Sequence, residues 1–282
     1  MLLSAFIRES TKALEAIYPS PEARGMVLML CEEWLGVRSY THIIEPSTGV
    51  PDDMLERMQA AVGRMAAGEP VQYVLGYCEF YGRRFNVAPG VLIPRPETEG
   101  LVCEALTAAM SMDRPARILD LCTGSGCIAW TLALELPSAE VTAVDISPEA
   151  LEIARRQYPG HSPVFVQADV TDPDQDFGVG QVDLLLSNPP YIMNKEKAGM
   201  RCNVLDFEPH LALFVPDDDP LVFYRSIARI AASHLAPDGT GIVEINETLG
   251  EQTADVFKAA GFRNVSVLSD FCGKARFVKF RR

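Results

Sequence analysis

The residues best suited to chemistry form one short run, Asn188, Pro189, Pro190 and Tyr191, which follows a segment with the apolar residues Val182, Leu184, Leu185 and Leu186. That segment predicts a buried parallel strand, and ligands of open α/β sheets gather where such strands end. A residue before proline is restricted to extended geometry, and proline itself has no N–H. The backbone here is therefore stiff and presents hydrogen-bond acceptors.

These acceptors suit a planar –NH2 group. The Asn188 carboxamide and the Pro189 carbonyl can accept its hydrogens, and the Tyr191 ring can pack on its face. The lone pair of the nitrogen is then left facing an electrophile in line with it. The alternative interpretation is a plain Pro-Pro turn after a core strand, and the rest of the chain must decide between the two.

A glycine-rich turn follows an earlier apolar strand, residues 118–121, and precedes an apolar helix. The turn consists of Cys122, Thr123, Gly124, Ser125 and Gly126. Strand, glycine turn and helix form the first half of a nucleotide-binding βαβ unit. Glycines let the backbone pass close to a ligand, and the start of the following helix supplies free N–H groups.

Two carboxylates follow the next two predicted strands. Asp145 ends strand 141–144, where a carboxylate can accept from both vicinal hydroxyls of a ribose. Asp169 follows strand 164–166, where it can accept from an adenine amino group. The turn has neither the G-x-G-x-x-G frame nor the lysine of a P-loop, so we expect S-adenosylmethionine rather than NAD or ATP.

Three domains are predicted along the chain. Residues 1–70 have helical periodicity, with Ser20 as the expected cap and Pro21 as the first residue of one helix and another helix opening at Pro51. They predict a small helical bundle that either docks a substrate or only stabilises the chain. Residues 71–95 combine aromatic and β-branched residues with glycines from Val71 onward, which predicts a β-hairpin linker. Residues 96–282 form the ligand-binding domain, in which Ser147 caps a helix.

Composition narrows the function classes. The chain has 282 residues, 48% of them hydrophobic, which is enough for one large core and a smaller domain. Its formal net charge of −13 argues against direct nucleic-acid binding. No apolar run approaches the length of a membrane span and no signal-peptide core begins the chain, so we expect a cytoplasmic protein with no membrane partner. The 7 cysteines contain no C-x-x-C pair and the 4 histidines are dispersed, so we expect reduced thiols and no metal.

The motifs resemble those of class I S-adenosylmethionine-dependent methyltransferases that act on a planar amino or amide nitrogen. The resemblance is carried by Asp120 to Gly126, Val144 to Ser147 and Asn188 to Tyr191. More narrowly, the chain from about residue 68 to its end resembles the release factor glutamine methyltransferase family. That likeness lies in Phe80 to Phe85, Ile93 to Glu99 and Phe207 to Pro209.

The resemblance implies an α/β fold, with a Rossmann-like seven-stranded sheet, a small N-terminal helical domain and a β-hairpin linker. It implies that the methionine end, ribose and adenine of S-adenosylmethionine contact Cys122, Thr123, Gly124, Ser125, Gly126, Asp145, Ile146, Asp169, Val170 and Asn188. It implies that the substrate amide and the catalytic step involve Asn188, Pro189, Pro190 and Tyr191. Cys122 stands where many members have the first glycine, so the tightest part of the turn must suit a residue with a Cβ.

The implied reaction is methyl transfer to the side-chain amide nitrogen of the glutamine in the Gly-Gly-Gln motif of peptide chain release factors, by a monomer, with S-adenosylhomocysteine as product. Asn188 would orient the poorly nucleophilic nitrogen and stabilise the positive charge that builds on it. Three alternatives stay open: a ribosomal-protein glutamine methyltransferase, a nucleic-acid adenine or guanine amino methyltransferase, and a non-catalytic binding protein that keeps the fold.

Overall fold

The computed structural model describes residues 1–160 and 162–282, and the chain divides into two compact units. We call Met1–Tyr77 with Arg201–Phe207 the helical unit, and Cys78–Met200 with Glu208–Arg282 the sheet unit. Within the part of the chain described, no helix is long and apolar enough to cross a membrane.

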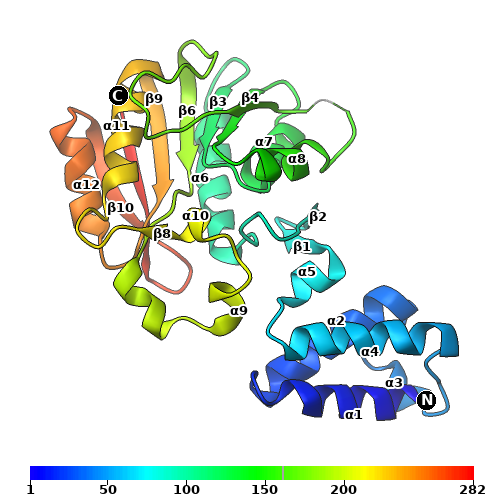
Figure 1. Ribbon diagram of the computed structural model, residues 1–282. Coiled ribbons are helices and arrows are strands. Elements are labelled where there is room, and N and C mark those ends of the chain that lie inside the picture. Colours follow the sequence, from blue (N-terminus) through cyan, green and yellow to red (C-terminus); the bar gives the residue numbers. More distant parts are fainter. Residues whose placement is uncertain (161) are drawn as a thin grey trace. The chain divides into compact units, whose positions relative to one another are not determined.

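The helices of the helical unit are α1 (Leu3–Leu14), α2 (Ser20–Leu35), α3 (Thr41–Ile44), α4 (Asp52–Ala66), α5 (Val71–Leu75) and α9 (Cys202–Leu205). Four of these helices, α1, α2, α4 and α5, bury apolar residues in one common core, and Figure 1 shows how the helices lie together. The short segment around α9 is held to α2 by an ion pair between Arg201 and Glu22, with N–O distances of 2.7 and 2.9 Å.

Two local predictions in this unit are wrong. Val71–Leu75 is a helix rather than the first strand of a hairpin, because the Pro70 carbonyl accepts from Tyr73 N at 3.0 Å and starts a turn. Ser20 is the first residue of α2 and not its cap, because the Pro19 carbonyl already accepts from Ala23 N at 2.9 Å. The hairpin itself is shorter than predicted, with β1 at Tyr77–Phe80 and β2 at Arg83–Asn86.

The sheet unit is built on a seven-stranded sheet with the order β10-β11-β9-β6-β3-β4-β5. Its strands are β3 (Arg117–Leu121), β4 (Glu140–Asp145), β5 (Val164–Gln167), β6 (Val182–Ser187), β9 (Leu235–Glu244), β10 (Arg263–Ser269) and β11 (Ala275–Arg281). β11 runs antiparallel to both of its neighbours, and the other pairs are parallel.

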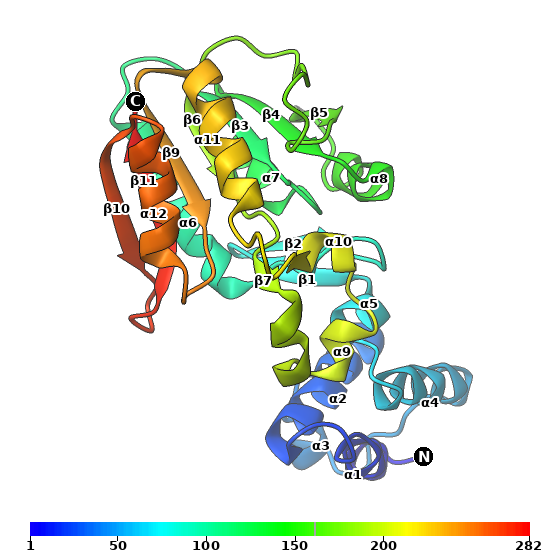
Figure 2. The same cartoon turned by 60° about the vertical axis from the view of Figure 1, so that its left-hand side comes forward.

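Helices cover both faces of this sheet, so alternate residues of a strand enter different cores (Figures 1 and 2). Ile118 of β3 packs in a core with α6 (Glu99–Met110) and α7 (Cys127–Glu135), whereas its neighbour Leu119 packs in a core with α11 (Val222–His234) and α12 (Gly250–Ala259). The helical segments of this unit are η1 (Pro96–Thr98), α6 (Glu99–Met110), α7 (Cys127–Glu135), α8 (Pro148–Arg155), η2 (Asn194–Gly199), α10 (His210–Leu213), α11 (Val222–His234) and α12 (Gly250–Ala259). A small separate pair of strands joins β7 (Ile192–Met193) to β8 (Phe214–Val215).

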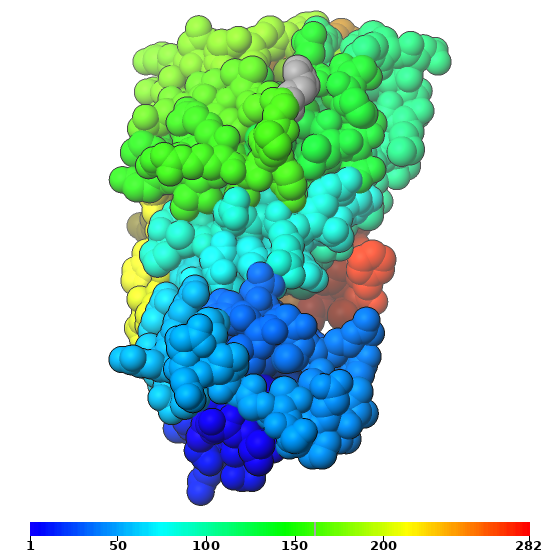
Figure 3. Space-filling view, turned by 90° about the vertical axis from the view of Figure 1, so that its right-hand side faces the viewer, coloured from blue at the N-terminus to red at the C-terminus, as the bar shows by residue number. Residues whose placement is uncertain are grey.

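The hairpin belongs to the core of the sheet unit. Phe80 and Phe85 are buried in the cluster that α6 and α7 form on the sheet. Tyr158 Oη donates to the Arg84 carbonyl at 2.5 Å, and the cyan hairpin meets the green surface of the sheet unit in Figure 3. The hairpin is therefore a fixed wall beside the sheet.

The strand register sets the position of the candidate site. Leu121 of β3 pairs with Val144 of β4 and with Ser187 of β6. The residues that follow these strands, the glycine turn, Asp145 and Asn188, therefore emerge at one edge of the sheet.

Candidate functional site

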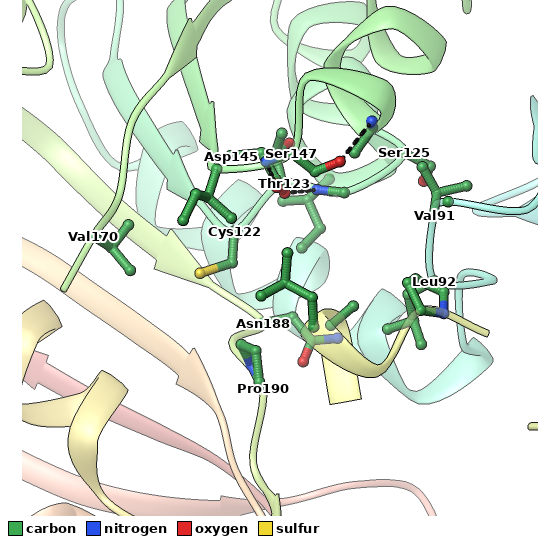
Figure 4. A pocket seen from close by; sticks show the side chains of 18 of the residues that line it. Val91, Leu92, Cys122, Thr123, Ser125, Asp145, Ser147, Val170, Asn188 and Pro190 are labelled. Carbon is green, nitrogen blue, oxygen red and sulfur yellow. Dashed lines mark hydrogen bonds between the residues drawn. The ribbon is translucent and has the colours of Figure 1, made fainter. Parts of the chain in front are cut away.

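A cavity of about 420 Å³ lies at the carboxyl edge of these parallel strands, within the size range of small-molecule sites. Asp145 and Thr123 lie on one side of it and Asn188 and Pro190 on the other, as Figure 4 shows. Two further walls come from the segment around Val91 and from α10 and α11. The described lining residues are Gly90, Val91, Leu92, Pro94, Arg95, Thr98, Cys122, Thr123, Gly124, Ser125, Cys127, Ile128, Asp145, Ile146, Ser147, Glu149, Ala150, Ala168, Asp169, Val170, Thr171, Asn188, Pro190, Pro209, Leu211, Ala212 and Phe223.

Asp145 organises the loop ends on its side of the cavity. Its Oδ2 accepts from Gly124 N at 2.7 Å, and its Oδ1 accepts from Ser147 N at 2.9 Å. Burial raises its pKa, and the two backbone N–H groups oppose that rise by favouring the carboxylate. Each oxygen keeps a lone pair, so the group can also accept from a pair of ligand hydroxyls.

Cys122 begins the glycine turn with φ +60°, a left-handed conformation that is unusual for a residue with a Cβ. The sequence predicts that the tightest part of the turn must accept a residue with a Cβ, and in the structure Cys122 adopts this left-handed conformation. Burial raises the pKa of the Cys122 thiol, so it stays protonated near neutral pH and does not act as a thiolate nucleophile.

The two turn glycines have different reasons to be glycine, which gives a testable contrast. Gly124 has φ +56° with open space around an added Cβ, whereas at Gly126, with φ +78°, an added Cβ would lie 3.1 Å from Ala154 Cβ. Gly124→Ala should lower the free energy of unfolding by about 1 kcal/mol through backbone strain alone. Gly126→Ala should lower it by about 2–3 kcal/mol, because strain and overpacking combine. Urea unfolding of both variants at one pH measures the difference, and equal losses would contradict it.

Asp120 lies behind the turn and is fully buried. Its Oδ2 accepts from Thr123 Oγ1 at 2.6 Å, while its Oδ1 has no hydrogen-bond partner in the described structure. Burial raises its pKa to about 7, against the Thr123 hydrogen bond, and the nearby Asp145 charge adds to the rise. Asp120 thus holds the Thr123 side chain in place through Oδ2, and its Oδ1 stays without a hydrogen bond behind the glycine turn.

Two buried side chains fasten the walls of the cavity. Gln157 donates to the Ser125 carbonyl at 3.0 Å and the Asn86 carbonyl at 2.9 Å, so it joins the glycine turn to the hairpin. Glu208 accepts from Ile93 N at 3.1 Å and from Arg95 Nη2 at 2.5 Å. The segment that contains Ile93 and Arg95 is thereby fixed to Glu208.

Asn188 is held by a short series of hydrogen bonds on the other side of the cavity. Its Nδ2 donates to Thr98 Oγ1 at 3.3 Å, and the Thr98 hydroxyl donates to Glu244 Oε2 at 2.7 Å. Tyr191 Oη donates to the other oxygen, Glu244 Oε1, at 3.1 Å. The half-buried Asn188 is thus tied to η1 and to the end of β9.

Glu244 is fully buried at the end of β9. Burial raises its pKa to about 7, while the hydrogen bonds from Thr98 and Tyr191 oppose that rise. Two hydroxyl donors on one carboxyl group favour its ionised form, which accepts on both oxygens.

The predicted site residues divide into two groups. Ten of them line the cavity, namely Cys122, Thr123, Gly124, Ser125, Asp145, Ile146, Asp169, Val170, Asn188 and Pro190. Gly126, Pro189 and Tyr191 stand behind the lining, with the Tyr191 hydroxyl turned to Glu244. Asp169 Oδ1 accepts from Thr171 N at 2.8 Å and from Thr171 Oγ1 at 2.6 Å. These two bonds stabilise the turn at residues 169–171, which lines the cavity.

Thr98, Asp120 and Glu244 are buried polar residues of the site to which the sequence prediction gives no role, although Thr98 and Asp120 lie within segments that carry the family resemblance. Asp120 interrupts the apolar strand β3, and Glu244 is the last residue of β9. Asp145 is identified in the sequence by a similar signal, a carboxylate at the end of an apolar strand. Thr98 carries no such signal, because its contact with Glu244 spans 146 positions of the chain.

Comparison with known proteins identifies the family of the chain. The family model "Methyltransferase small domain" matches residues 101–204, and the model "PrmC N-terminal domain" matches residues 5–76. The release factor glutamine methyltransferase of Bacteroides thetaiotaomicron is 41% identical over 282 residues, which is 99% of each chain. The chain belongs to the release factor glutamine methyltransferase family. The family member from Flavobacterium psychrophilum is 34% identical over 291 residues, again 99% of each chain.

A solved methyltransferase from Pyrococcus furiosus shares the fold, with a TM-score of 0.51 and 17% identity, covering 80% of this chain and 98% of that one. The resemblance and the α/β methyltransferase fold expected from the sequence are confirmed. This member of the family is a methyltransferase whose relatives are named for glutamine methylation.

Proposed function

We propose that this enzyme transfers a methyl group from S-adenosylmethionine to the side-chain amide nitrogen of the glutamine in the Gly-Gly-Gln motif of peptide chain release factors. One observation carries the proposal. A single cavity joins the glycine turn and Asp145 to Asn188 and Pro190, so the residues proposed to bind a nucleoside and those proposed to bind an amide face the same space.

The charge of the cavity supports this cofactor. Among its described lining residues, Asp145, Glu149 and Asp169 are acidic, and Arg95 is the one Lys or Arg side chain. Arg95 is paired with Glu208, so it offers little to a phosphate group. An acidic cavity of this kind favours a cationic ligand over a nucleotide phosphate.

When bound, S-adenosylmethionine supplies a methyl group on a sulfonium, and S-adenosylhomocysteine remains after the transfer. Asp145 would accept from the ribose hydroxyls, and Asp169 with Val170 would contact the adenine. Cys122 to Gly126 would line the methionine end, with no thiolate chemistry at Cys122.

Asn188 and Pro189 would hold the substrate amide. Its nitrogen is a poor nucleophile because its lone pair is delocalised into the carbonyl, so the protein's main contribution is placement. The Asn188 side chain, which lines the cavity, and the carbonyl of Pro189, which lies between the lining residues Asn188 and Pro190, would accept the –NH2 hydrogens and stabilise positive charge as it develops on nitrogen. Pro190 and Tyr191 shape the slot, and the nitrogen loses its proton after methylation, to water or a nearby acceptor.

A methyl-transfer assay tests the proposal. Labelled S-adenosylmethionine is offered with purified release factor, ribosomal proteins or total RNA, and the product is located by peptide mass spectrometry. We expect label on the Gly-Gly-Gln glutamine, and no label on a matched release factor in which that glutamine is replaced by glutamate. Label only on RNA or on a ribosomal protein would overturn the substrate.

The same assay addresses the helical unit, which we propose as a docking surface for the protein substrate. A short Gly-Gly-Gln peptide offers the acceptor without the rest of the factor. If the helical unit docks the factor, kcat/KM should be higher for whole factor than for the peptide. Equal values would contradict the docking role.

A further inference from the structure

A buried hydrogen-bonded group stands directly behind Asn188. It consists of Thr98 from η1, Tyr191 from the loop after β6 and Glu244 at the end of β9. The Thr98 side chain is buried and Glu244 is completely so. A buried carboxyl group is costly unless it is satisfied, so its partners indicate what it is there to hold.

The hydrogen-bond partners of the Glu244 carboxylate connect it to the candidate site. The nearby guanidinium of Arg276 pairs with Asp270 instead, at 3.0 Å. Among the described residues, the hydrogen bonds to the Glu244 carboxylate come from the Thr98 and Tyr191 hydroxyls. Thr98 also accepts a hydrogen bond from Asn188, so it connects the buried carboxylate to the site.

With Glu244 ionised, the chemistry of Glu244, Thr98 and Asn188 fixes the direction of the two hydrogen bonds that join them. An ionised carboxylate only accepts, and a threonine hydroxyl has one hydrogen to give. Because that hydrogen goes to Glu244, the Thr98 oxygen has only lone pairs left for Asn188. Asn188 must therefore turn its –NH2 to Thr98, and its carboxamide oxygen faces the other way.

We propose that Glu244 and Thr98 are positioning residues that hold the Asn188 carboxamide with its oxygen available to the substrate –NH2 group. This inference rests on the proposed function. With the carboxamide reversed, two –NH2 groups would face each other and neither would accept. The buried pair thus selects, before the substrate arrives, the one orientation that can bind it.

Thr98→Val tests this role, because valine has nearly the same shape and no hydroxyl. We expect kcat on the release factor to fall about tenfold or more, the effect of one lost orienting hydrogen bond. The Kd of S-adenosylmethionine by titration calorimetry and the KM of the factor should change by less than about threefold, since Asp145 and the docking surface are untouched. Thr98→Ser restores the hydroxyl and should recover most of the wild-type kcat.

Tyr224→Phe is the matched control. The buried Tyr224 hydroxyl donates to the backbone carbonyl of Glu244 at 3.1 Å, so its loss removes a hydrogen bond to the same residue outside the series. We expect a kcat close to wild type even if the Tm falls. A wild-type kcat in Thr98→Val, no recovery in Thr98→Ser, or an equal loss in Tyr224→Phe would each overturn the positioning role.

A second readout needs no substrate, so it separates this inference from the proposed function. In ¹⁵N NMR spectra of the free protein, the Asn188 side-chain –NH2 signals are assigned by their loss in Asn188→Asp. We expect a nuclear Overhauser contact between these protons and the Thr98 methyl group, and a change of their shifts in Thr98→Val but not in Tyr224→Phe. Unchanged shifts in Thr98→Val would show that the hydrogen bond does not form, whatever the enzyme methylates.

Discussion

Asn188→Ala should reduce kcat by on the order of a hundredfold or more, the usual consequence of removing one preorganised hydrogen-bonding group that acts in the transition state. Asn188 lines the cavity opposite Asp145, so its loss removes one of the implied cofactor contacts but leaves those of the glycine turn, Asp145 and Asp169 in place. The Kd of S-adenosylmethionine should therefore stay within about threefold of wild type. Single-turnover kinetics and titration calorimetry give the two quantities separately.

Asn194→Ala is a control of the same residue type from the same segment. Asn194 Nδ2 donates to the Val215 carbonyl at 3.0 Å, and the side chain does not line the cavity. This variant also loses one amide hydrogen bond, but we expect nearly wild-type turnover. If Asn188→Ala retained its turnover, or if both variants lost it equally, Asn188 would not have the proposed role.

The sequence predicts those parts of the fold whose signal is local. The centre of strand β6 is the buried apolar run Leu184 to Leu186, as expected for a parallel strand covered on both faces, and Ser147 caps α8 by accepting from Ala150 N at 3.1 Å. Asp145 is identifiable because an acidic residue ends an otherwise apolar strand. In each case a few neighbouring residues carry the whole signal.

The sequence fails where tertiary structure decides. Val71–Leu75 is rich in β-branched and aromatic residues, yet it is helical, with Val71 and Val74 buried together in the helical unit. Strand propensity is weak beside such burial. The Thr98–Glu244 contact likewise joins segments that only the folded sheet brings together, so no local pattern reveals the support behind Asn188.

Asp145→Ala should weaken S-adenosylmethionine binding by on the order of a hundredfold, because hydrogen bonds to a charged group contribute about 1.5–3 kcal/mol each. The structure adds a second cause to the loss of ribose contacts. Without the carboxylate, Gly124 N and Ser147 N lose the acceptor that holds both loop ends. Titration calorimetry measures the Kd, and kcat at saturating cofactor should fall much less than the affinity.

Glu140→Ala separates this local effect from a general loss of charge. Glu140 is an exposed acid at the opposite end of the same strand, so its removal changes the net charge equally but leaves the loop ends intact. We expect wild-type affinity for S-adenosylmethionine in this variant. A Kd that rose equally in both variants would trace the effect to the overall field of an acidic protein. A Kd unchanged in Asp145→Ala would place the ribose elsewhere in the cavity, because a carboxylate that binds both hydroxyls cannot be removed without loss of affinity.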